Sequence, residues 1–103
     1  MPDYEEDISK VLDDFIRDCP EWIVKKSIEE LKNILTDEII ETTKGFHSKD
    51  PKTWWATYHH GWGTGIRNYL RDKVCRDDEL PSENWDDYYI QLFEMACGIR
   101  EAK

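Results

Sequence analysis

The sequence predicts an all-α protein, a compact bundle of four to five short helices around a glycine-bearing central helix at about residues 51–72. Apolar residues recur at helical spacing along the whole chain, and this periodicity is the main indicator of helices. Prolines, glycines and capping residues divide the periodic segments into short lengths. At 103 residues the chain suits one core, so we expect residues 1–103 to form a single helical domain.

The first predicted helix lies near the N-terminus and ends near Cys19-Pro20. A residue that precedes a proline avoids the helical conformation, which sets this end. Acidic residues early in the segment suit the positive end of the helix dipole. The apolar stripe of this helix consists of Tyr4, Ile8, Val11 and Phe15.

Two further helices are predicted before residue 50. The first carries an apolar stripe, and the capping-box pattern at Ser27 and Glu30 favours a start at Ser27 over Pro20. Thr36 caps the second helix, which we expect to end around Lys44-Gly45 and to be followed by a polar loop over 45–50. The apolar stripe of the first is Val24, Ile28, Leu31 and Leu35.

The central helix is predicted to begin at Asp50-Pro51, an acidic cap followed by a proline in the first turn. Its glycines each cost roughly 1 kcal/mol relative to alanine. Another helix packed closely over Gly61 and Gly65 would offset this cost, and a break at Gly61 is the main alternative. The periodic residues that support one helix over about 51–72 are Trp55, His59, Trp62, Ile66 and Tyr69.

A charged connection over residues 73–81 leads to the last predicted helix. Ser82 is expected to cap this helix, and Gly98 is expected to end it. Its apolar residues are Trp85, Tyr89, Leu92, Phe93 and Ala96.

Composition limits the function classes. The net charge of −9 repels phosphate, which disfavours direct binding to nucleic acid or to an anionic membrane and favours a basic protein partner. The odd number of widely spaced cysteines predicts neither disulfides nor a zinc site, and we expect no metal or cofactor. The acidic first residues and the lack of a long apolar run predict a cytoplasmic protein. The cysteines are Cys19, Cys75 and Cys97.

The run 59–68 gathers most of the polar and aromatic residues that a site would use. His60, Arg67, Asn68 and Arg71 are candidates for binding an anion such as a nucleotide phosphate, because a titratable group lies beside fixed cations. The alternative is that Arg67 pairs with one of the many internal acids. No catalytic motif stands out. The expected structural cluster is His59, Gly61, Gly63, Gly65 and Ile66.

Aromatic residues beside the main apolar stripes are candidates for an interface. Tryptophan and tyrosine are the usual anchors of protein interfaces, and acids around them would steer a basic partner. Five tryptophans also exceed what a small core easily buries, which leaves a homodimer open. The acidic residues could also imitate the phosphates of DNA, but the lysines interspersed among them weaken this hypothesis. The interface candidates are Trp54, Tyr58, Trp85 and Tyr88.

The residues from His59 to Asn68 resemble the signature of a family of short, uncharacterised proteins of bacteria and their phages. The shared pattern is a histidine, a glycine four positions later, and an Ile-Arg-Asn triplet. The resemblance implies a small helical fold and supplies no activity. The matching positions here are His59, Gly63, Ile66, Arg67 and Asn68.

Three functions remain open from the sequence. The first is a protein-interaction module that docks a basic partner, and the resemblance makes a phage or bacterial defence-related inhibitor its sharpest form. The second is the anion or nucleotide-phosphate site at His60, Arg67 and Asn68, with or without catalysis. The third is a structural accessory protein in which the cluster serves packing.

Overall fold

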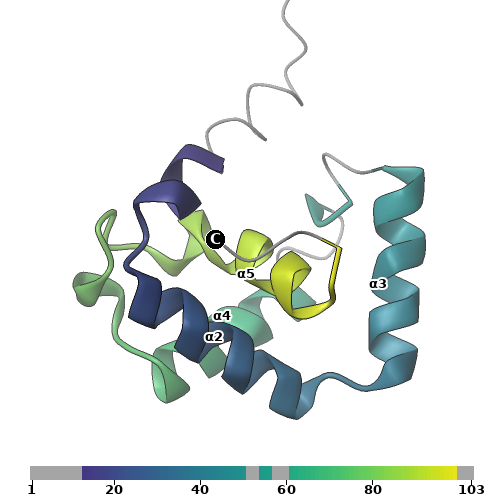
Figure 1. Ribbon diagram of the computed structural model, residues 1–103, viewed down its shortest axis with the longest axis horizontal. Coiled ribbons are helices and arrows are strands. Elements are labelled where there is room, and N and C mark those ends of the chain that lie inside the picture. The colour runs from purple at the N-terminus through teal and green to yellow at the C-terminus, as the bar shows by residue number, and fades with distance from the viewer. Residues whose placement is uncertain (1–12, 51–53, 57–60, 100–103) are drawn as a thin grey trace, which may run out of the picture.

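The structure, a computed structural model, is all-α in the parts of the chain that it describes, residues 13–50, 54–56 and 61–99 (Figure 1). The predicted fold class is confirmed, and no strand occurs in those ranges. No helix in those ranges has the length and apolar character that crossing a bilayer requires. After the helical residues 13–18, the elements are α2 (Glu21–Ile34), α3 (Asp37–Lys49), α4 (Trp62–Lys73), the 3-10 helices η2 (Asp77–Glu79) and η3 (Trp85–Asp87), and α5 (Tyr89–Ala96).

Helix α5 lies at the centre of the core. All eight of its residues are buried, and α2 and α4 both pack against it (Figure 1). A helix that is apolar around most of its circumference is stable only where other elements surround it. The prediction that the glycine-bearing helix is central is therefore wrong, and that place belongs to α5.

The predicted single helix over about 51–72 is also wrong. Helix α4 begins at Trp62, and the preceding Gly61 has φ −100° and ψ −92°, outside the helical region. Residues 54–56 have turn and 3-10 conformations and are not α-helical. A helix through residue 61 would add the entropic cost of Gly61 to that of Gly63 and Gly65, which α4 already contains. The alternative of a break at Gly61 agrees with the start of α4.

The close packing expected over Gly61 and Gly65 occurs at Gly63 instead. A Cβ atom built on Gly63 would lie 2.8 Å from the Tyr89 hydroxyl oxygen and 3.3 Å from two of its ring atoms. Nothing lies within 4 Å of the corresponding positions at Gly61 and Gly65. Gly63 is thus the residue that lets α4 approach the buried Tyr89 ring of α5.

We expect alanine substitutions at two glycines of α4 to have opposite effects. Gly63→Ala forces a contact with a rigid buried ring, and we expect it to lower the free energy of unfolding by about 1–2 kcal/mol. Gly65→Ala meets open space in the same helix and should raise it by about 0.5–1 kcal/mol. Urea unfolding measures both, and a change of the same sign in the two variants would contradict the assigned packing.

Two predicted boundaries near α2 and α3 need correction. Helix α2 begins directly after Pro20, and Ser27 is buried inside it, where it cannot cap a helix start. Helix α3 continues through Gly45 to Lys49, so the predicted loop over 45–50 is wrong. This extra turn brings Phe46 against the core, which stabilises the longer helix. The Thr36 cap is confirmed, since its hydroxyl oxygen accepts a hydrogen bond from the Ile39 amide at 3.2 Å.

The C-terminal part of the chain is more irregular than predicted. Trp85 lies in η3, ahead of α5, and the side chain of Asn84 rather than Ser82 provides the cap, accepting from the Asp86 amide at 2.9 Å. The predicted end of the last helix at Gly98 is confirmed by its φ of +79°, a conformation that favours glycine. The end of the first helix near Cys19-Pro20 is confirmed as well.

Candidate functional site

Arg67, the centre of the proposed anion site, has internal partners. Its Nε donates to Asp86 Oδ1 at 2.8 Å, and an Nη donates to Thr64 Oγ1 at 2.9 Å. The guanidinium carbon also lies 5.0 Å from the centre of the Tyr89 ring, within cation–π range. The side chain is 9% exposed. The alternative of an internal ion pair at Arg67 is confirmed.

Arg71 contacts both Asn68 and an internal acid, Asp77. An Arg71 Nη donates to Asn68 Oδ1 at 2.7 Å, and Arg71 Nε donates to Asp77 Oδ1 at 2.5 Å. The second carboxylate oxygen of Asp77 accepts from the Trp85 amide at 3.0 Å. Burial alone would raise the pKa of Asp77, but the hydrogen bonds from Arg71 and from the Trp85 amide outweigh it and hold that pKa below its ordinary value.

These contacts tie α4 to the connection that contains η2 and η3. They engage the cations proposed to hold an anion. The remaining member of that group, His60, lies outside the described residues, as does His59 of the expected structural cluster. Within the expected structural cluster, Gly63 and Ile66 are buried, whereas Gly61 and Gly65 are exposed. The described part of the cluster therefore joins elements of the fold to one another.

The interface candidates are buried, contrary to prediction. Trp54, Trp85 and Tyr88 are at most 5% exposed, and Tyr58 lies outside the described residues. The Trp85 indole N–H donates to the Cys75 carbonyl at 3.0 Å, and the Tyr88 hydroxyl accepts from the Ser82 amide at 3.1 Å. Large aromatic rings with a satisfied polar atom gain most when fully buried. The large apolar side chains that are exposed in the described residues are Trp22, Ile34 and Ile39.

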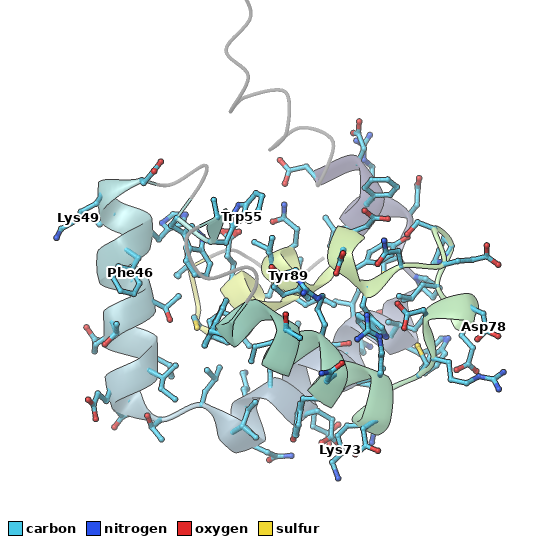
Figure 2. The ribbon with its side chains drawn as sticks, turned by 180° about the vertical axis from the view of Figure 1, so that it is seen from behind. Phe46, Lys49, Trp55, Lys73, Asp78 and Tyr89 are labelled. Carbon is cyan, nitrogen blue, oxygen red and sulfur yellow. The ribbon has the colours of Figure 1, made fainter. Side chains whose placement is uncertain are left out.

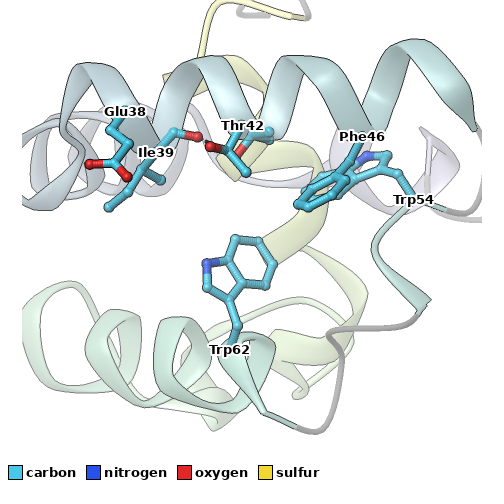
Figure 3. Close-up of a pocket in the computed structure, with 7 residues that line it drawn as sticks. Glu38, Ile39, Thr42, Phe46, Trp54 and Trp62 are labelled. Atoms are coloured by element: carbon cyan, nitrogen blue, oxygen red, sulfur yellow. Dashed lines mark hydrogen bonds between the residues drawn. The ribbon is translucent and has the colours of Figure 1, made fainter.

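An apolar groove with a volume of about 240 Å³ lies between α3 and two tryptophans, Trp54 and Trp62 (Figure 3). We call it the α3 groove. Trp62 rises from the start of α4 toward α3, and Glu38 lies at the opposite end of the lining residues from Phe46 and Trp54. The side of the groove on α3 consists of Glu38, Ile39, Thr42, Thr43 and Phe46.

The tryptophan wall of the α3 groove is supported from behind by the core. The Trp62 and Phe93 rings meet edge to face with centroids 4.6 Å apart, and Trp54 lies 5.7 Å from Trp62 in a similar arrangement. Such edge-to-face contacts orient aromatic rings. Because Phe93 belongs to the fully buried α5, this wall is fixed before anything binds.

Polar atoms in the α3 groove are few. The Thr43 hydroxyl donates to the Ile39 carbonyl at 2.8 Å. The Trp54 indole N–H is buried and meets no acceptor in the described part of the chain, which costs about 1–3 kcal/mol. Glu38 is exposed, and no cation of the described residues pairs with it. The groove therefore combines an aromatic interior with one carboxylate at its end.

Helix α3 stands along one side of the molecule (Figures 1 and 2). Only Thr43 among its residues is buried. The extended residues Leu35 and Thr36 connect it to α2, and His47 Nε2 lies 3.5 Å from Glu94 Oε2 of α5. Because only one residue of α3 is buried, part of the surface between α3 and the core remains accessible.

Sequence reasoning missed the α3 groove. Glu38, Thr42 and Phe46 lie four residues apart and so share one helix face, but a face that mixes an acid, a hydroxyl and one ring has no distinctive apolar pattern. The sequence pattern predicts that Trp62 lies inside a longer helix, with its ring in the core stripe. The groove depends on the break at Gly61, which the periodicity did not favour.

Metal binding and thiol chemistry find no support in the residues described. No group of three or more histidine, cysteine or acidic side chains there is arranged to hold a metal ion. The three cysteines are buried free thiols, and burial raises the pKa of Cys75 and of Cys97 to about 11, which disfavours the reactive thiolate. Comparisons with protein families, with characterised proteins and with solved structures found no match to this chain.

Proposed function

We propose that this chain is a small interaction module that docks a basic segment of another protein in the α3 groove. The observation that carries the proposal is the groove itself, an open aromatic cleft beside a carboxylate that no described cation pairs with. Its volume of about 240 Å³ is below the roughly 300–1,000 Å³ of sites for drug-sized molecules. It suits a single large side chain, which is how anchors of protein interfaces are seated.

The charge of α3 supports a basic partner. Asp37, Glu38 and Glu41 lie in its first two turns and are all exposed. The chain as a whole carries a net charge of −9, so a positively charged segment is attracted from a distance and a negatively charged one is repelled. The attraction would steer the segment to a groove whose interior provides the contact area.

The resemblance to short bacterial and phage proteins supports a more specific form of this proposal. In that form the module is a cytoplasmic inhibitor that blocks a basic surface of a bacterial or phage protein. The same acidic charge that steers the segment would also keep the module from binding nucleic acid directly.

Filling the groove tests the proposal. Random peptides displayed on phage would be selected against the wild-type chain, and the enriched peptides would be measured against two variants. Thr42→Phe places a ring in the groove from an exposed position of α3, whereas Ser48→Phe places the same ring on α3 outside the groove. We expect Thr42→Phe to weaken binding at least about tenfold, because central anchors contribute about 2 kcal/mol or more, and Ser48→Phe to leave it unchanged.

Two results would overturn the proposal. In the first, selection enriches no peptide family that contains both a large apolar residue and lysine or arginine. In the second, Thr42→Phe and Ser48→Phe bind the enriched peptides equally well. Circular dichroism of both variants provides the folding control, because phenylalanine differs little from threonine and serine in helix propensity.

A further inference from the structure

We infer that the α3 groove selects its occupant by charge, and that its ligand class is an apolar ring or chain with a cationic group beside it. The inference rests on the proposed function, because an apolar residue next to a lysine or arginine in a partner segment presents such a group. It adds which end of the groove meets the cation and which residue recognises it.

The groove has two chemically different ends. Glu38 and Phe46 are eight residues apart on α3, which places their backbones about 12 Å apart along the helix axis at 1.5 Å per residue. Trp62 faces the stretch between them (Figure 3). A ring seated against Trp62 thus lies about one helical turn from the Glu38 carboxylate, the reach of a short alkyl-ammonium chain.

The carboxylate of Glu38 is available to a cation. Two other acids of α2 and α3 have internal partners, Glu41 with Lys44 at 3.9 Å and Glu30 with Lys26 at 3.4 Å. Glu38 has no such partner among the described residues. The aromatic faces of the groove add to its preference for a cation, because the face of an indole or phenyl ring carries negative partial charge.

Three probes with one ring system and different charges test the inference. Tryptamine carries an ammonium, indole is neutral, and indole-3-propionate carries a carboxylate. Each would be titrated into the ¹⁵N-labelled chain while the indole N–H signals of Trp54 and Trp62 are followed. We expect dissociation constants on the order of 1 mM for ligands of this size. Tryptamine should bind about 2–5 times more tightly than indole, the range of an exposed ion pair, and indole-3-propionate should bind most weakly.

Two matched variants test whether Glu38 is the residue that recognises the cation. Glu38→Gln should abolish the advantage of tryptamine over indole. Glu41→Gln removes a carboxylate of the same helix that does not line the groove, and it should preserve the advantage.

The outcomes separate this inference from the proposed function. Equal affinity for the three probes, or an equal effect of the two glutamine variants, would overturn the charge selectivity and leave an apolar docking groove in place. No shift of Trp54 or Trp62 with any probe would overturn the inference as well. The peptide selection against Thr42→Phe decides the docking proposal independently of these results.

Discussion

Replacing Trp85 by alanine is expected to lower the free energy of unfolding by about 3–5 kcal/mol. The side chain is fully buried, its indole N–H donates to the Cys75 carbonyl at 3.0 Å, and its backbone amide donates to Asp77 at 3.0 Å. Truncation would leave a cavity and deprive the buried Cys75 carbonyl of its donor. Since domains of this size have about 5–15 kcal/mol of stability in total, the variant should be marginally folded.

Trp22→Ala is the matched control for Trp85→Ala. The same substitution there removes a side chain that is 56% exposed, and we expect a change of no more than about 0.5 kcal/mol. Urea unfolding of both variants should give different midpoints and similar slopes, because the slope follows the surface exposed on unfolding. Equal midpoints would show that η3 does not anchor the core as described.

The more conservative variant Trp85→Phe separates the contribution of Trp85 packing from that of its hydrogen bond. Phenylalanine retains most of the ring volume and removes the donor to Cys75. We expect a loss of about 1–3 kcal/mol, the cost of a buried carbonyl left without a partner together with the smaller ring. A loss as large as that of Trp85→Ala would assign the effect of the alanine variant to the hydrogen bond rather than to the cavity.

The predictable part of this fold is the part that local chemistry controls. The helical class follows from apolar periodicity, the start of α3 from the Thr36 cap, and the end of α5 from the need for a positive φ at Gly98. Each of these depends on a few neighbouring residues. The same local rules failed at Ser27, where a capping-box pattern lies inside a helix because the residue faces the core.

The candidate site was less predictable because it depends on contacts distant in sequence. Arg67 pairs with Asp86, nineteen positions later, and Gly63 is packed by Tyr89. No periodicity within α4 reveals which acid or ring will face it. The α3 groove is the extreme case, since Glu38 and Trp62, which both line it, are 24 positions apart in the sequence.

Arg67→Ala is expected to lower the free energy of unfolding by about 2–3 kcal/mol. Breaking a fully buried ion pair typically costs about 3–5 kcal/mol. The expected loss in this protein is smaller because the Asp86 side chain is 42% exposed and water would solvate it once Arg67 is gone. Part of the loss comes from the contact with the Tyr89 ring, which Arg67→Lys should retain only partly, since lysine lacks the planar guanidinium.

Arg71→Ala provides the comparison at a more exposed ion pair. Its guanidinium pairs with Asp77, and the two side chains are 37% and 30% exposed. We expect a loss under about 1 kcal/mol, as for surface ion pairs. Thermal and urea unfolding would rank the two arginine variants, and a larger loss at Arg71 would contradict the order of burial.

A double-mutant cycle of Arg67 and Asp86 tests whether Arg67 stabilises the fold. If Arg67 and Asp86 stabilise one another, the loss in Arg67→Ala combined with Asp86→Ala should be smaller than the sum of the single losses, by at least about 0.5 kcal/mol. In that case the arginine within the Ile-Arg-Asn triplet is a structural residue, and the binding surface is to be sought at α3. If the single losses are small and additive, the pair contributes little to folding, and Arg67 would again be a candidate for holding an external anion, with Asp86 as the group that the anion displaces.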